Sequence, residues 1–195
     1  MNIIVKTHEG RCYCRPDTTW EREDKDLFSP DYVNSFLYTP VLFARICKAG
    51  KYVGRKFAGR YYDSAGYGIL LYAGDLFDAS PLSYASASCL DHTSVLQLPT
   101  CDIQAPGKDG NTFKVYKDNL EIFSTSEESH CRIEDAISET SAIVSLRIGD
   151  MIAVELAGPA LLGRRNSPET GEAGGKNEIR GTFGGNDLFN FRIIF

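Results

Sequence analysis

The chain has 195 residues, of which 43% are hydrophobic, and its formal net charge at pH 7 is −5. This length and composition suit one globular domain and exclude an intrinsically disordered chain. An acidic chain lacks the overall positive field that attracts nucleic acid or an anionic membrane, and no stretch approaches the ~20 apolar residues of a membrane span. We therefore expect a cytoplasmic protein with neither of these partners.

The first third of the chain predicts strands interrupted by a long polar loop. Residues 2–6 (NIIVK) are typical of an opening strand, and residues 15–35, which are polar and contain two prolines, predict a flexible loop. Residues 38–53 predict a strand, a turn and the start of a second strand, with Pro40 indicating a sheet edge or a bulge. A short helix is expected within residues 54–62.

The middle of the chain alternates between strand and helix patterns. Residues 68–76 (GILLYAGDL) predict a buried strand, whereas residues 78–94 favour neither helix nor strand. Residues 112–125 predict a β-hairpin that turns at Asp118-Asn119. Residues 132–146 place apolar side chains at helical spacing, with acidic residues near the start, and predict a helix.

The last third of the chain is again typical of strands. Residues 146–156 predict a strand entered through a Gly-Asp turn, and residues 163–178 predict a glycine-rich flexible loop. Residues 179–195 predict two strands joined at Gly-Gly-Asn-Asp. The whole chain, 1–195, is therefore expected to form a single mainly β (α+β) domain with two short helices.

The sequence contains few local catalytic or metal-binding motifs. His8, Cys12 and Cys14 lie close together, but no second cluster completes a zinc site, and His92 and His130 stand alone. The six cysteines form no C-x-x-C pair, so we expect reduced thiols. There is no G-x-S-x-G nucleophile motif and no phosphate-binding loop.

The order of several segments nevertheless resembles the fumarylacetoacetate hydrolase family. The longest such segment is GKYVGRKFAGRYYDSAGYGI, and the others extend over nearly the whole chain: RPDT (15–18), LFSPDYVNSFLYTPVLFARI (27–46), CLDHTSVL (89–96), SLRIGDMIAV (145–154) and GTFGGNDLFNFRI (181–193). The resemblance implies a mixed β-roll like the C-terminal domain of that family, and a homodimer. It also implies Mg²⁺- or Mn²⁺-dependent chemistry on small 2-oxo or β-diketo acids.

Carrying the family's site over residue by residue alters that expectation. The three metal-ligand positions fall on Thr39, Val41 and Leu70, and the site lysine falls near Ser88. Hard divalent cations take oxygen ligands, usually with several carboxylates, so we expect no bound metal and no other cofactor.

Two functions follow, and a third hypothesis concerns one residue. The first is a pseudoenzyme with a binding or assembly role, whose partner is a small carboxylate ligand or an active paralogue. The second is a metal-independent or altered hydrolase, decarboxylase or isomerase with a rebuilt site. Its candidate residues near the former pocket are Tyr38, Tyr72, Asp75, Ser88, Asp91 and His92. The third hypothesis is that a shift in strand register brings the carboxylate of Glu155 into the site.

Overall fold

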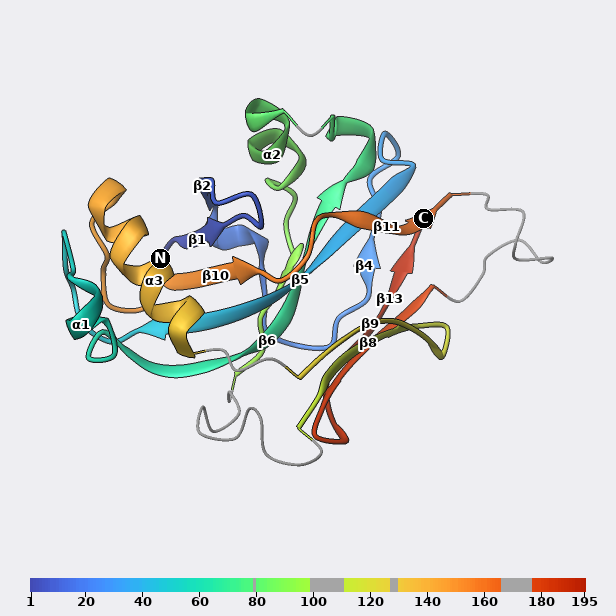
Figure 1. Ribbon diagram of the computed structural model, residues 1–195. Helices are drawn as coiled ribbons and strands as arrows, with labels where there is room; N and C mark the ends of the chain where they lie inside the picture. The colour runs from blue at the N-terminus through green and yellow to red at the C-terminus, as the bar shows by residue number, and fades with distance from the viewer. Residues whose placement is uncertain (79, 99–110, 127–129, 166–176) are drawn as a thin grey trace.

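The computed structural model describes residues 1–78, 80–98, 111–126, 130–165 and 177–195. Within these residues the chain forms an eight-stranded sheet, a five-stranded sheet and three α-helices (Figure 1). The fold is mainly β with short helices and curled sheets, as the sequence predicts.

The larger sheet is built on two twelve-residue strands, β5 (Ser35–Ile46) and β6 (Tyr62–Ala73), which pair antiparallel along most of their length. Both strands are rich in apolar side chains, which suits strands buried on both faces. The sheet order is β2-β1-β10-β5-β6-β7-β3, and β11 also pairs with β5. The remaining strands are β1 (Ile3–Lys6), β2 (Cys12–Arg15), β3 (Trp20–Glu21), β7 (Ser94–Val95), β10 (Met151–Glu155) and β11 (Ala160–Arg164).

The smaller sheet contains both predicted hairpins. Its order is β4-β13-β12-β8-β9. One hairpin turns at Asp118 and Asn119 and the other at Gly184 and Gly185, all with positive φ, the conformation that tight hairpin turns require. Its strands are β4 (Leu27–Phe28), β8 (Phe113–Lys117), β9 (Leu120–Thr125), β12 (Glu178–Phe183) and β13 (Asn186–Ile194).

The helices lie outside the sheets, with α1 (Arg55–Ala58) and α3 (His130–Ile143) together at one end and α2 (Pro81–Ala87) apart from them (Figure 1). The sequence predicts α1 and α3 but not α2. Ser80 caps α2 by accepting a hydrogen bond from the Ser83 N–H, and proline occupies the first helical position. Across the described residues, the helices are too short or too polar to form a membrane span.

Four expectations need correction. Pro40 lies in a central strand, at the point where β5 changes partner from β10 to β11. No second strand begins at residues 51–53, because the N–H groups of Tyr52 and Val53 donate to Ser141 of α3 and not to a neighbouring strand. The expected loop at 15–35 includes β3 and β4.

The glycine-rich loop expected at 163–178 is narrower in the structure. Residues 163 and 164 belong to β11 and residue 178 begins β12, whereas residues 166–176 lie outside the described part of the chain.

Side-chain alternation gives the larger sheet two different faces. Leu42 and Leu71 belong to the core shared with the smaller sheet and α3. Val41, Leu70 and Tyr72 belong to a second core shared with α2 and β2. Residues two apart on a strand share a face, so the expected ligand positions all lie on the α2 face.

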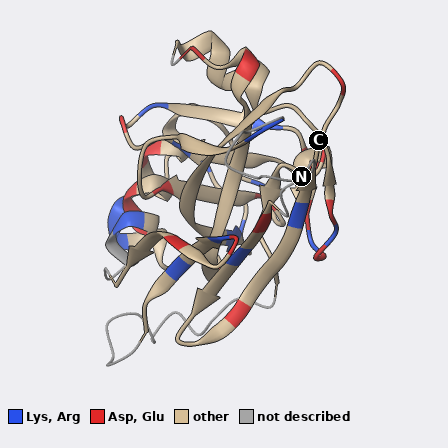
Figure 2. Cartoon of the chain, turned by 90° about the vertical axis from the view of Figure 1, so that its right-hand side faces the viewer, with Lys and Arg blue, Asp and Glu red and all other residues tan. Residues whose placement is uncertain are grey.

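Charged residues are mixed over the side of the molecule shown in Figure 2. Lys and Arg (blue) and Asp and Glu (red) are interspersed on the strands and loops in this view. Among the described residues, a mixed distribution of this kind produces no extended field of one sign on that side.

Candidate functional site

The three positions that the resemblance assigns to metal ligands are neighbours in the structure. Thr39 on β5 is directly opposite Leu70 on β6, and Val41 is two residues further along β5. All three residues are fully buried, and the Thr39 hydroxyl donates to the Ala157 carbonyl at 2.5 Å. The scaffold therefore gathers these positions, but their side chains supply no carboxylate.

A buried carboxylate does lie beside them. Glu155 ends β10, is paired with Val41 without any shift in register, and has a fully buried side chain. One carboxylate oxygen accepts a hydrogen bond from the Tyr72 hydroxyl. The other oxygen accepts a hydrogen bond from the His8 backbone N–H at 3.0 Å and also lies 3.3 Å from His8 Nδ1. Glu155 therefore reaches this face through regular pairing, and its oxygens already have donors.

Two tyrosines extend this hydrogen-bonded group. The hydroxyl oxygens of Tyr13 and Tyr72 are 2.7 Å apart. The Tyr72 hydroxyl already donates its hydrogen to Glu155, so the Tyr13 hydroxyl is the donor in the hydrogen bond between the two tyrosines. Burial raises the pKa of Tyr72 well above its usual value of 10, and the nearby Tyr13 and Glu155 raise it further. Burial also raises the pKa of Tyr13. Both tyrosines are therefore neutral hydrogen-bond donors at physiological pH, not bases.

Arg15, the first residue of the RPDT segment, is fully buried on the other side of Tyr72. Its guanidinium lies 5.1 Å from the centre of the Tyr72 ring, within the range of a cation–π contact. It donates to the carbonyls of Leu71, Ser88 and Thr93 and to the Ser94 hydroxyl. The positive charge of Arg15 and the negative charge of Glu155 thus flank one tyrosine. Sequence reasoning missed both Arg15 and Tyr13, although the RPDT match is a signal for Arg15.

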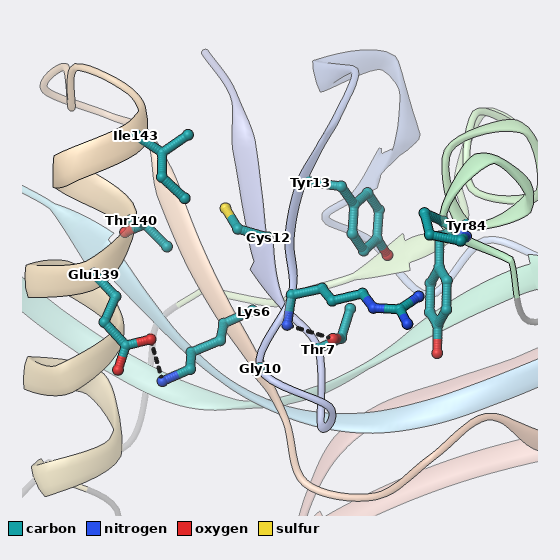
Figure 3. Close-up of a pocket in the computed structure, with 11 residues that line it drawn as sticks. Lys6, Thr7, Gly10, Cys12, Tyr13, Tyr84, Glu139, Thr140 and Ile143 are labelled. Carbon is teal, nitrogen blue, oxygen red and sulfur yellow. Dashed lines mark hydrogen bonds and ion pairs between the residues drawn. The ribbon is translucent and has the colours of Figure 1, made fainter.

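A pocket of about 420 Å³ opens beside this group, between the β1–β2 hairpin, α2 and α3 (Figure 3). Tyr13 and Tyr84 line one part of it, and Lys6, which pairs with Glu139 at 2.7 Å, lines another. Burial, followed by the neighbouring Cys14, raises the pKa of Cys12 in this pocket to about 11. Cys12 is therefore a neutral thiol and a poor nucleophile.

The other candidate site residues do not gather around Tyr72 but lie in different parts of the fold. Ser88 ends α2, where its hydroxyl donates to the Ala85 carbonyl. Tyr38 lies in the core on the opposite face, and its hydroxyl donates to the Ile122 carbonyl. Asp75 accepts the backbone N–H groups of Asn34 and Ser35, an arrangement that secures the start of β5.

Asp91 and His92 line a second pocket, of about 530 Å³, with Leu27 and Phe36. Leu27 and Phe36 belong to the core on the face opposite Leu70 and Tyr72. The structure therefore brings only Tyr72 and the backbone of Ser88 into the group around the expected ligand positions.

The residues at the expected metal site do not fit Mg²⁺ or Mn²⁺. A hard cation needs several oxygen ligands, and here the neighbouring carboxylate is already hydrogen-bonded to Tyr72 and His8. Within the described residues, no three His, Cys, Asp or Glu side chains gather into a metal-ligand group.

Several solved structures that resemble this chain are described as fumarylacetoacetate hydrolase family proteins or as hydrolases or isomerases of small organic acids. One, described as of that family and from Yersinia pestis CO92, has a TM-score of 0.74 and 15% identity, with 99% of this chain and 92% of the other covered. The chain therefore has the fold of the fumarylacetoacetate hydrolase family, as its motifs predict.

Two enzymes show what proteins of this fold do elsewhere. Fumarylpyruvate hydrolase from Pseudomonas aeruginosa, in complex with Mn²⁺ and pyruvate, has a TM-score of 0.76 and 14% identity, with 100% of this chain and 90% of the other covered. 5-Carboxymethyl-2-hydroxymuconate delta-isomerase from Mycobacterium smegmatis has a TM-score of 0.75 and 14% identity, with coverage of 99% and 78%. No family model matches the sequence, and no curated protein does either.

Proposed function

We propose that this protein keeps the fumarylacetoacetate hydrolase fold without metal-dependent catalysis and serves as a binding or assembly protein. The observation that carries this proposal is the chemistry at the expected ligand positions. Thr39, Val41 and Leu70 are fully buried and offer no carboxylate.

The surroundings of Glu155 support the same proposal. A carboxylate available to a metal needs free lone pairs, whereas both oxygens of Glu155 accept hydrogen bonds from Tyr72 and His8. The buried positive charge of Arg15 lies across the Tyr72 ring. The group is thus satisfied by protein donors, which is the condition for burying a carboxylate at low cost.

Metal titration followed by thermal unfolding tests the proposal. A ligand that binds only the folded state raises the unfolding temperature in a saturable way. We expect no saturable rise with MgCl₂ or MnCl₂ for this protein. The Pseudomonas aeruginosa fumarylpyruvate hydrolase, whose structure contains Mn²⁺, is the positive control. A saturating rise comparable to that of the control would overturn the proposal.

A second function has one observation in its favour. The pocket of about 420 Å³ is lined by the cationic side chains of Lys6 and Arg11, which pair with Glu139 and Glu9, and by Tyr13, whose hydroxyl contacts that of Tyr72. A metal-independent or altered hydrolase, decarboxylase or isomerase acting on a small 2-oxo or β-diketo acid would use such groups to hold a carboxylate. Turnover of acylpyruvates or oxaloacetate, lost in Tyr13→Phe, would establish it. No turnover would leave the binding role.

The proposed binding or assembly role implies two kinds of partner, a small ligand and a second protein chain. A small carboxylate would occupy this first pocket, and assembly would take the form of a homodimer or of a complex with an active paralogue. Sedimentation velocity over a range of concentrations measures the homodimer directly, and a monomer throughout would contradict it.

A further inference from the structure

The second pocket, on the opposite face of the larger sheet from Leu70 and Tyr72, has the dimensions of a small-molecule site. Its volume of about 530 Å³ falls within the range of ~300–1,000 Å³ that is typical of ligand pockets. Its apolar lining comes from separate segments of the chain: Leu27, Phe28, Pro30, Phe36 and Leu90. Phe28 is 71% exposed, so one aromatic ring remains accessible to a ligand.

The charged groups that line this pocket differ in whether they already have partners. Lys25 is paired with Glu23 at 2.8 Å, and Asp26 is paired with Arg192 at 2.6 Å, so these two lining residues already have partners. No hydrogen bond or ion pair from a described residue holds the exposed carboxylate of Asp91. The pocket therefore presents an available negative charge beside an apolar wall.

His92, next to Asp91, adds a positioned polar group. Its Nδ1 lies 2.7 Å from Glu21 Oε2, and Glu21 Oε1 accepts the backbone N–H groups of Arg22 and Glu23. This anchoring directs Nε2 away from Glu21.

The backbone at His92 is also constrained. Its φ is +60°, a left-handed conformation that residues other than glycine rarely adopt. The His92 N–H donates to the Thr18 carbonyl at 3.3 Å, and β7 begins two residues later. The hydrogen bond to Thr18 and the start of β7 thus fix the backbone of His92 at the pocket.

We propose that this second pocket binds a small organic ammonium ion with an apolar or aromatic body. The carboxylate of Asp91, which no described residue engages, accepts hydrogen bonds and therefore requires a donor on the ligand. Among the charged residues that line the pocket, Lys25 and Asp26 are each held in an ion pair, which leaves the carboxylate of Asp91 as the charge available to a ligand. The Phe28 ring offers a face for a cation–π contact. The proposal does not depend on the metal-free role argued for the other face.

Titration with 2-phenylethylammonium, followed by ¹H–¹⁵N chemical shifts and by calorimetry, tests this site. We expect saturable shifts around Asp91 and His92. 3-Phenylpropionate has a similar phenyl body but a carboxylate, and we expect it to bind at least about fivefold more weakly because it meets Asp91 with like charge. Equal or tighter binding of the propionate, or no saturable binding of the amine, would overturn the proposal.

Two variants test whether the carboxylate of Asp91 contributes to amine binding. Asp91→Asn keeps the shape of the side chain and removes its charge, and we expect it to weaken amine binding about threefold to fivefold. Asp63→Asn, at the opposite end of β6, is the matched control and should leave the affinity unchanged. If Asp91→Asn binds the amine as well as the control does, the assignment of Asp91 is wrong. The comparison of the two ligands on the unmodified protein is independent of how either variant folds.

Discussion

At the residue scale, the hydroxyl of Tyr72 determines whether Glu155 is satisfied in the core. Tyr72 donates to Glu155 and accepts from Tyr13, so one oxygen atom links β6 to β10 and β2. The raised pKa of Tyr72, caused first by burial, keeps its proton in place. An aromatic side chain of the same shape without the hydroxyl would leave the Glu155 oxygen without this donor.

Tyr72→Phe is therefore expected to lower the free energy of unfolding by about 1–3 kcal/mol, the cost of a buried polar group left unsatisfied. Urea unfolding measures the change. Tyr32→Phe is the matched control, because Tyr32 is 62% exposed, and it should have little effect. Equal stability of the two variants would show that the Tyr72 hydroxyl does not hold Glu155.

At the element scale, the position of α2 depends on hydrogen bonds at its N-terminus. The Asp78 carboxylate accepts hydrogen bonds from Ser80 and Ser83, which lower its pKa from 3.8 to about 2. Ser80 in turn caps the helix. These contacts precede the segment that carries Tyr84 to the first pocket and Ser88 to Arg15.

The sign of the pH dependence follows from the lowered pKa of Asp78. Its stabilising contribution is complete above the unfolded pKa near 3.8 and is lost as the pH falls toward about 2. We expect the urea midpoint of the unmodified protein to exceed that of Asp78→Asn above this window, and the difference to shrink as the pH falls through it. A difference that stays constant with pH would contradict this origin.

The helices and strands also show which elements can be predicted from local sequence patterns. The hairpin at Asp118-Asn119, the second half of strand β6 and helix α3 were predictable because their signals lie within the segments themselves. Helix α2 was missed because its Ser- and Ala-rich sequence has little apolar periodicity. The central place of Pro40 was also missed, because it depends on where β10 and β11 end, which is set more than 100 residues away in the chain.

At the scale of the whole molecule, Arg15 joins segments that are far apart in the sequence. Its guanidinium hydrogen bonds connect β2 to β6, to the end of α2 and to β7. A fully buried guanidinium requires such partners, since an unpaired buried charge is very costly. Arg15 therefore contributes to the arrangement of the α2 face as a whole.

Arg15→Met should lower the free energy of unfolding by about 3 kcal/mol or more, because several buried carbonyls lose their donor together. Arg11→Met, four residues earlier and with a side chain 49% exposed, is the control and should change stability little. Urea unfolding of both variants measures the difference. A loss in Arg15→Met no larger than in the control would show that the guanidinium is dispensable.

The sequence by itself determined the class of fold and the absence of carboxylates at positions 39, 41 and 70, since both follow from residue identity and the order of segments. Only the tertiary structure decided what fills the site. Glu155 contacts residues 83 and 147 positions away, and Arg15 contacts residues 56 to 79 positions away. It also separated His92 and Asp91 from Tyr72 onto opposite faces of one sheet. Such contacts depend on strand register and sheet order, which join distant segments and leave no local pattern in the chain.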